Sequence, residues 1–367
     1  MTVAGLNRRQ FVSGAAAAAA AATVGVAAKS AASASTNLGP ASLSASVQVR
    51  LPAGPRYRVI SDNDYSGDPD GLYQLVHHLL SPSVDIRAVI GSHLAPNDPF
   101  DPSTQTATNA YRRVLEVLEL TGLKDRVHAY QGSNLALSST TVPIRSAGAQ
   151  AIVAEAMRTD TNLPLYATFG AGLTELASAY LIEPRIADRL TAIWIGGPEY
   201  PGMAEPPPGS QGIEYNLNID VKAAQVVFND SAIRLWQVPR NAYRQCLIGL
   251  LELHADVRPR GKVGAYLYEK IFHIFELAAQ FGLNLGETYI LGDSPLVLLS
   301  ALQSSFQPDT TSSRHLTMAA PRINDDGTYK PRTGGRQIRV YTELDVRLMF
   351  GDLFAKLETN YGRDASS

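Results

Sequence analysis

Apolar and polar positions alternate with two different periods along this chain. Short runs rich in β-branched and aromatic residues predict strands at 57–61, 86–90, 127–129, 165–168, 192–195 and 233–238. Apolar residues spaced three and four apart predict helices at 72–80, 106–120, 147–158, 173–181 and 222–228. Residues 240–286 are predicted to be mostly helical, and a strand at 337–342 and a helix at 344–357 end the pattern. The alternation predicts an α/β fold, with an open, mainly parallel sheet flanked by helices on both faces.

Four polar or glycine-rich loops follow the predicted strands, at 62–71, 91–101, 169–172 and 196–218. Ligands of open α/β sheets bind beyond the carboxyl ends of the strands. We therefore expect the functional residues in these loops.

The first loop carries an unusual concentration of acid, with Asp62, Asp64, Asp68 and Asp70 within nine residues. Carboxylates this close raise one another's pKa and repel unless a cation or a proton intervenes. A hard divalent cation held by oxygen ligands explains the cluster, and a solvated Asx-rich turn is the alternative. Asp293 precedes an apolar run, where a carboxylate is costly unless it is paired or binds a cation.

The composition excludes several classes of function. The chain has 367 residues, 45% of them hydrophobic and 18% charged, with a formal net charge of −2. A nucleic-acid-binding surface requires a basic face, which this balance does not provide, so we expect no nucleic-acid partner. The single cysteine, Cys246, excludes an internal disulfide and a cysteine-based zinc site.

The first residues are typical of a targeting segment. Arg8 and Arg9 precede an apolar run of Ala, Val and Gly, which resembles a twin-arginine export signal at residues 1–33. A membrane anchor is the alternative, but the run is short and alanine-rich. A Ser- and Ala-rich flexible leader is expected at 34–52 and one catalytic domain at 53–362. We expect export to the extracellular, periplasmic or cell-wall space, with no membrane association after cleavage.

Four stretches, in order, are similar to the inosine-uridine-preferring nucleoside hydrolase family. Residues 62–70, DNDYSGDPD, resemble that family's Asp-x-Asp-Pro-Gly-x-Asp-Asp. Residues 163–197 resemble its strand, Gly-x-Leu-Thr turn, helix and Gly-Gly, and residues 213–231 its Glu-Phe-Asn motif. Residues 292–295, Gly-Asp-Ser-Pro, stand where the family often has His-Asp-Pro. The resemblance implies that family's Rossmann-like fold and calcium-dependent hydrolysis of the N-glycosidic bond of a ribonucleoside or related N-riboside.

The resemblance also implies roles for individual residues. Asp64 would act as the general base on a metal-bound water. The implied Ca²⁺ ligands are Asp64, Asp70, Asp293 and the backbone carbonyl of Gly170, with Asp68 as a further candidate. The implied substrate-binding residues are Asp62, Asp68, Ser92, Glu214 and Asn216. Candidate contacts to the leaving group are Tyr65, His93, Tyr215 and Tyr243. The implied partner is a small-molecule nucleoside, and the family suggests a homodimer or homotetramer.

Two departures from the family keep other functions open. One extra residue separates Asp68 from Asp70, and Gly292 replaces a histidine that could protonate the leaving group. A secreted nucleoside- or sugar-binding protein that keeps the metal pocket without turnover is one alternative. A phosphohydrolase of the haloacid dehalogenase type is the other, because it also has Asp-x-Asp after its first strand.

Overall fold

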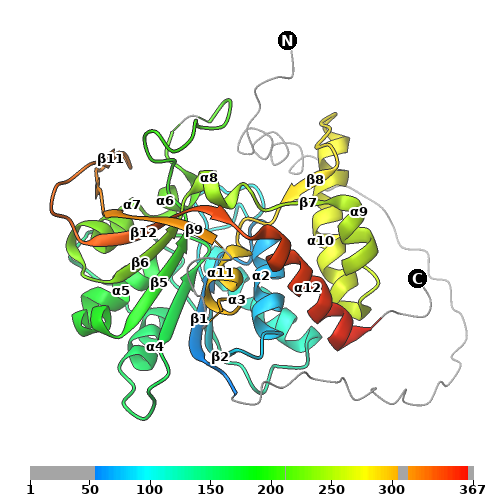
Figure 1. Cartoon of the computed structure of the whole chain (residues 1–367), viewed down its shortest axis with the longest axis horizontal. Coiled ribbons are helices and arrows are strands. Elements are labelled where there is room, and N and C mark those ends of the chain that lie inside the picture. Colours follow the sequence, from blue (N-terminus) through cyan, green and yellow to red (C-terminus); the bar gives the residue numbers. More distant parts are fainter. Residues whose placement is uncertain (1–53, 211, 305–312, 363–367) are drawn as a thin grey trace, which may run out of the picture.

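The computed structural model describes residues 54–210, 212–304 and 313–362 (Figure 1). The predicted export signal at 1–33 and leader at 34–52 lie outside the described residues. Within the described part of the chain, no helix is long and apolar enough to cross a membrane.

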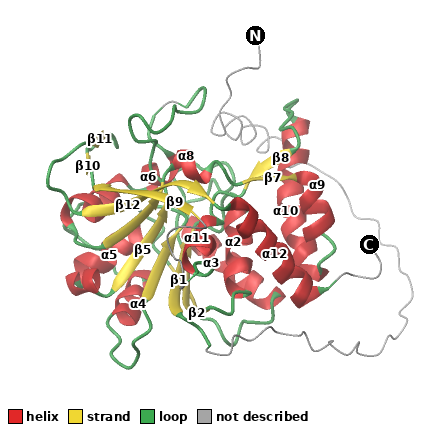
Figure 2. Cartoon of the chain, in the orientation of Figure 1, coloured by secondary structure: helices red, strands yellow, loops and turns green. Residues whose placement is uncertain are grey.

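One eight-stranded sheet organises the molecule, in the order β3-β2-β1-β4-β5-β6-β12-β9 (Figures 1 and 2). Its strands are β1 (Tyr57–Asn63), β2 (Val84–Gly91), β3 (Ala129–Gln131), β4 (Leu165–Phe169), β5 (Leu190–Ile195), β6 (Arg234–Val238), β9 (Ser313–Ala319) and β12 (Gln337–Leu344). All neighbours pair in parallel except β9, which is antiparallel to β12. The fold class predicted from the sequence is confirmed. The strand order reverses between β1 and β4, which marks the position where doubly wound sheets bind ligands.

Helices cover both faces of the sheet over two apolar cores. One core includes α4 (Ala147–Ala156), α5 (Thr174–Ile182) and α7 (Val221–Gln225). The other includes α2 (Asp70–Leu79), α3 (Thr106–Leu120), α10 (Gly261–Gln280), α11 (Pro295–Ser300) and α12 (Val346–Tyr361). Successive strand residues point to opposite faces. Trp194 of β5 accordingly lies in the first core and Ile193 and Ile195 lie in the second.

The segment predicted to be mostly helical is more varied than the sequence suggested. It contains α8 (Arg240–Tyr243), β7 (Leu247–Gly249), α9 (Leu250–Glu252), a π-helix η3 (Leu253–Val257) and α10. β7 pairs with β8 (Thr288–Ile290), and β10 (Arg322–Ile323) pairs with β11 (Tyr329–Lys330). The remaining elements are η1 (Pro184–Asp188), α6 (Tyr215–Ile219) and η2 (Val226–Asp230).

Backbone hydrogen bonds join the ends of the three strands at the switch point. Ser92 N donates to Asn63 O, and Gly170 N donates to Asp62 O, both near 3.0 Å. The loops that follow β2, β1 and β4 therefore begin side by side at one edge of the sheet.

Candidate active site

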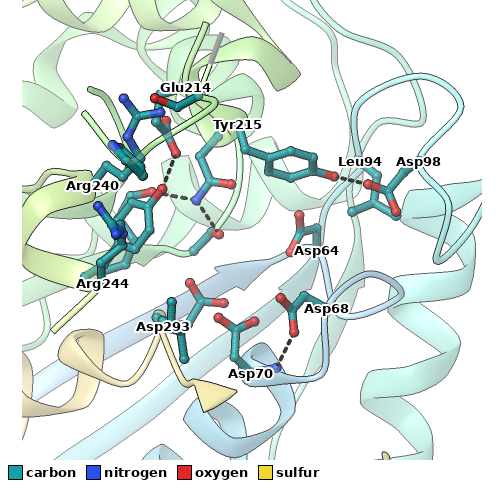
Figure 3. Close-up of a pocket in the computed structure, with 18 of the residues that line it drawn as sticks. Asp64, Asp68, Asp70, Leu94, Asp98, Glu214, Tyr215, Arg240, Arg244 and Asp293 are labelled. Atoms are coloured by element: carbon teal, nitrogen blue, oxygen red, sulfur yellow. Dashed lines mark hydrogen bonds between the residues drawn. The ribbon is translucent and has the colours of Figure 1, made fainter. Parts of the chain in front are cut away.

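A cavity of about 320 Å³ lies at this edge (Figure 3). All four loops predicted to carry functional residues line it, together with α8 and the segment after β8. Its volume is at the lower end of the range for small-molecule sites.

Four aspartates form what we call the floor of the cavity: Asp64 and Asp68 from the loop after β1, Asp70 from the start of α2, and Asp293 from the segment after β8. In Figure 3 their carboxylates gather around a shared space. Asp68 accepts a hydrogen bond from Tyr289 Oη at 2.6 Å, and Asp70 Oδ1 accepts one from Gly71 N at 3.0 Å.

Asn63 lies beneath the floor and is fully buried. Its Nδ2 donates to Asp293 Oδ2 at 3.0 Å, and its Oδ1 accepts from Asp64 N at 2.8 Å. A Cβ at Gly170 would lie only 2.3 Å from Asn63 Nδ2, so glycine is required for this close approach. One amide therefore fixes parts of the floor that come from two distant segments.

A chain of buried hydrogen bonds continues from Asn63 away from the cavity. Asn63 Nδ2 also lies 3.3 Å from Gln74 Oε1, and Gln74 Nε2 donates to His78 Nδ1 at 2.5 Å. His78 Nε2 is 2.8 Å from Ser300 Oγ, which donates to Leu296 O. We call Asn63, Gln74, His78 and Ser300 the buried polar chain. It connects β1, α2 and α11 below the site.

Asp62 is fully buried behind the floor and does not line the cavity. Its Oδ1 accepts a 2.5 Å hydrogen bond from Ser92 Oγ, and its Oδ2 has no hydrogen-bond partner among the described residues. Burial and the nearby charges of Glu175 and Asp64 raise the pKa of Asp62 well above its usual value, against the lowering effect of Ser92.

Glu214 and Asn216 form one wall of the cavity. Glu214 caps α6 by accepting from Leu217 N, and it also accepts from Gly197 N and Tyr243 Oη. Asn216 Nδ2 donates to the carbonyls of Gly170 and Ile195, at 2.9 and 2.7 Å. Both hydrogens of the Asn216 amide are used, so its Oδ1 is the atom left to accept from a ligand.

The rim of the cavity has two chemically different sides (Figure 3). On one side Tyr215 Oη donates to Asp98 Oδ2 at 2.5 Å, joining the loops after β5 and β2. On the other side lie Arg240 and Arg244 of the α8 segment.

The structure brings most of the predicted site residues to the cavity, namely Asp64, Asp68, Asp70, Gly170, Glu214, Tyr215, Asn216, Tyr243 and Asp293. The predicted residues Asp62, Ser92, Tyr65 and His93 do not line it. Tyr65 Oη bonds to Ser61 Oγ, and His93 bonds to Leu94 O and Thr174 Oγ1. Both side chains are buried.

The floor suits a hard cation. Its metal-binding groups would be carboxylate oxygens, and the Gly170 carbonyl lines the same cavity. Ligand sets made of oxygen atoms favour Ca²⁺ over softer metals. Burial, and to a smaller extent the charges of Asp70 and Asp293, raises the pKa of the Cys246 thiol. Within the described residues no three acidic, His or Cys side chains already form a metal-binding group.

Sequence reasoning missed Asn63, Asp98, Arg240 and Arg244. Asp98 lies in a predicted ligand loop and next to Asn97, whose φ of 57° is unusual for a residue other than glycine. Nothing in the sequence distinguishes Arg244 from other surface arginines.

The fold and this acidic pocket at the switch point define an α/β protein of the nucleoside hydrolase fold. Solved structures support this: a plant nucleoside hydrolase, at 18% identity, covers 83% of this chain and 99% of its own with a TM-score of 0.62. A purine-preferring ribonucleoside hydrolase from Gardnerella vaginalis gives 16% identity, the same coverage and a TM-score of 0.63.

Two curated proteins share a short segment with this chain. The inosine-uridine preferring nucleoside hydrolase of Leishmania major is 43% identical over 61 residues, which is 16% of this chain and 18% of the relative. The protein of the same name from Crithidia fasciculata is 41% identical over 68 residues, 18% of this chain and 19% of the relative. The match spans about a fifth of these curated relatives. No family model matches. The predicted resemblance to nucleoside hydrolases is thus confirmed in the fold and in this segment.

Proposed function

We propose that this protein hydrolyses the N-glycosidic bond of a ribonucleoside or related N-riboside with the help of Ca²⁺. The observation that carries the proposal is the acidic floor, built from two distant segments beneath the Glu214 and Asn216 wall in one cavity. The fold shared with nucleoside hydrolases supports it.

In this proposal Asp64, Asp70, Asp293 and the Gly170 carbonyl hold the ion. The Gly170 oxygen already accepts from Asn216, and a carbonyl has a second lone pair for a cation. When bound, Ca²⁺ would orient and acidify a water at C1′. Asp64 takes the proton of the attacking water.

The other residues bind the sugar and stabilise charge. Bond cleavage develops positive charge on the ribose ring, which the carboxylates of the floor stabilise. Asp68 and the free lone pairs of Glu214 and Asn216 Oδ1 accept hydrogen bonds from ribose hydroxyls. Tyr215 and Tyr243 lie on the cavity and remain candidates for contact with the leaving group.

The test is release of free base from inosine and uridine by the full chain in Ca²⁺. We expect turnover that is lost in Asp64→Ala and on chelation with EGTA, and kept in Asp125→Ala, which removes an exposed carboxylate outside the cavity. Nucleoside binding without turnover would favour the binding-protein alternative. Release of phosphate from p-nitrophenyl phosphate would favour the phosphohydrolase alternative.

We further propose that residues 1–33 direct export by the twin-arginine pathway and that 53–362 act as one domain. Replacing both Arg8 and Arg9 with lysine is expected to keep the protein inside the producing cell. Light scattering of the exported protein would determine whether it forms the dimer or tetramer suggested by the family.

A further inference from the structure

Two arginines stand one helical turn apart on the rim of the cavity. Arg244 N donates to Arg240 O at 3.1 Å, and both side chains line the pocket. Figure 3 shows them on the same side of the cavity, across from Asp98 and Tyr215.

Arg240 is neutralised by Glu199. Its Nε and Nη2 reach Glu199 Oε1 and Oε2 at 2.7 and 2.5 Å, and the Glu199 side chain is 3% exposed. This is the two-pronged geometry in which a guanidinium is strongly bound to a carboxylate. Arg240 is therefore occupied by the protein itself.

Arg244 is different. Its guanidinium makes no hydrogen bond or ion pair with any residue in the described part of the chain, although the residue is half-buried. The same cavity is also lined by the apolar residues Pro207, Pro208 and Ile213, and charges interact more strongly beside apolar surfaces than in open water. One uncompensated positive charge thus faces a cavity whose floor is negative.

We infer that Arg244 binds an anionic group, a phosphate or a carboxylate, carried by the substrate. The inference rests on the proposed N-riboside hydrolysis and narrows its substrate class. The planar guanidinium of arginine can bind two oxygens of either anion at once. The floor repels an anion, and the rim arginine attracts it, so the two together would orient the substrate with its sugar towards the carboxylates. The anion could be a 5′-phosphate on the sugar or a carboxylate on the leaving group.

The experiment compares kcat/KM for three matched ribosides: uridine, uridine 5′-monophosphate and orotidine. We expect one anionic riboside to be preferred over uridine, and which one it is identifies the source of the anion. In Arg244→Gln the anionic-to-neutral ratio should fall roughly 10- to 100-fold, in line with the loss of a charged hydrogen bond. Arg244→Lys should recover part of the ratio, because lysine restores the positive charge but not the paired hydrogen bonds of a guanidinium. Arg112→Gln, an exposed arginine outside this cavity, is the control.

A wild-type protein that prefers uridine, or a ratio that is equal in wild type and a folded Arg244→Gln, would overturn the inference. Where wild type cleaves no riboside, calorimetric binding of the same three compounds to the wild-type and Arg244→Gln proteins in Ca²⁺ separates this outcome from failure of the proposed function. If no riboside is cleaved but an anionic one binds more tightly than uridine in an Arg244-dependent manner, the hydrolase proposal fails and the anion subsite stands. Equal binding of all three compounds would contradict the anion subsite.

Discussion

The side-chain amide of Asn63 donates to Asp293 Oδ2 at 3.0 Å, across 230 residues of sequence. The same amide group accepts from the backbone of Asp64. Residues that orient metal ligands in this way commonly contribute 10- to 100-fold to metal affinity.

We therefore expect Asn63→Ala to weaken Ca²⁺ binding roughly 10- to 100-fold, measured by titration calorimetry on chelator-stripped protein. Asn360→Ala is the matched control, because its amide donates to Lys356 O within α12. An unchanged affinity in a folded Asn63→Ala protein would show that Asp293 needs no such support.

Gly170→Ala should disturb the same contact from the opposite side. The new Cβ would lie 2.3 Å from Asn63 Nδ2 and 2.5 Å from its Cγ, so Asn63 has to move. We expect a loss of about 1–3 kcal/mol in the free energy of unfolding, together with weaker Ca²⁺ binding. Gly351→Ala in α12 meets no atom within 4 Å and should add about 0.5–1 kcal/mol through helix propensity. Denaturant titration of both variants tests the contrast, and equal effects would refute it.

The bond between Tyr215 and Asp98 predicts energetic coupling between two loops. Tyr215→Phe removes this bond, and Asp98→Ala removes it together with the bond that Asp98 Oδ1 accepts from Phe100 N, so the double variant should resemble Asp98→Ala. In kcat/KM for the best riboside we expect a coupling free energy of about 1–3 kcal/mol. Tyr180→Phe, whose hydroxyl bonds to Asp230 O away from the cavity, is the control. Additive effects would mean that the two loops act independently.

Two buried histidines predict a loss of stability in acid. Burial lowers the pKa of His77 to about 4, although its bond to Asp352 opposes the shift, and burial lowers that of His78 to about 3. The unfolded chain, with histidine pKa near 6.5, binds protons that the folded chain does not. Stability is therefore retained above pH 6.5 and lost as the pH falls below it, by about 2 kcal/mol per histidine at pH 5.

Denaturant titrations at pH 7 and pH 5 measure this loss. His77→Gln should lose about 2 kcal/mol less than wild type between the two pH values. His273→Gln, on the exposed side of α10, should match wild type. If His77→Gln has the wild-type pH dependence, His77 is charged in the folded protein and the assignment is wrong.

The central strands were predictable because burial on both faces makes them continuous apolar runs, as in Leu190–Ile195. The edge strand Ser313–Ala319 was not, because it pairs only with β12 and its residues are exposed or half-exposed, Leu316 by 50%. An edge strand with polar residues carries little of the apolar signal on which sequence reasoning relies.

The residues of the candidate site also fall into a group that the sequence predicts and a group that it does not. The aspartates of the floor were predictable because they cluster in the sequence. Asn63 and Arg244 were not, because their importance comes from what lies beside them in space. Gly292, where the resemblance leads one to expect a histidine, lines the cavity, and a Cβ there would lie 3.3 Å from Asp70 Oδ2 and 3.4 Å from Tyr243 Cδ2.

The buried polar chain also constrains the order in which the molecule can be assembled. Strands β1 to β6 use residues up to Val238 and can pair early, as the chain leaves the ribosome. The contacts to Asp293 and Ser300 wait until much later segments have folded against β1 and α2. The proposed calcium site should therefore form only after residues 293–300 have packed against β1 and α2, and calcium affinity would report that step of folding.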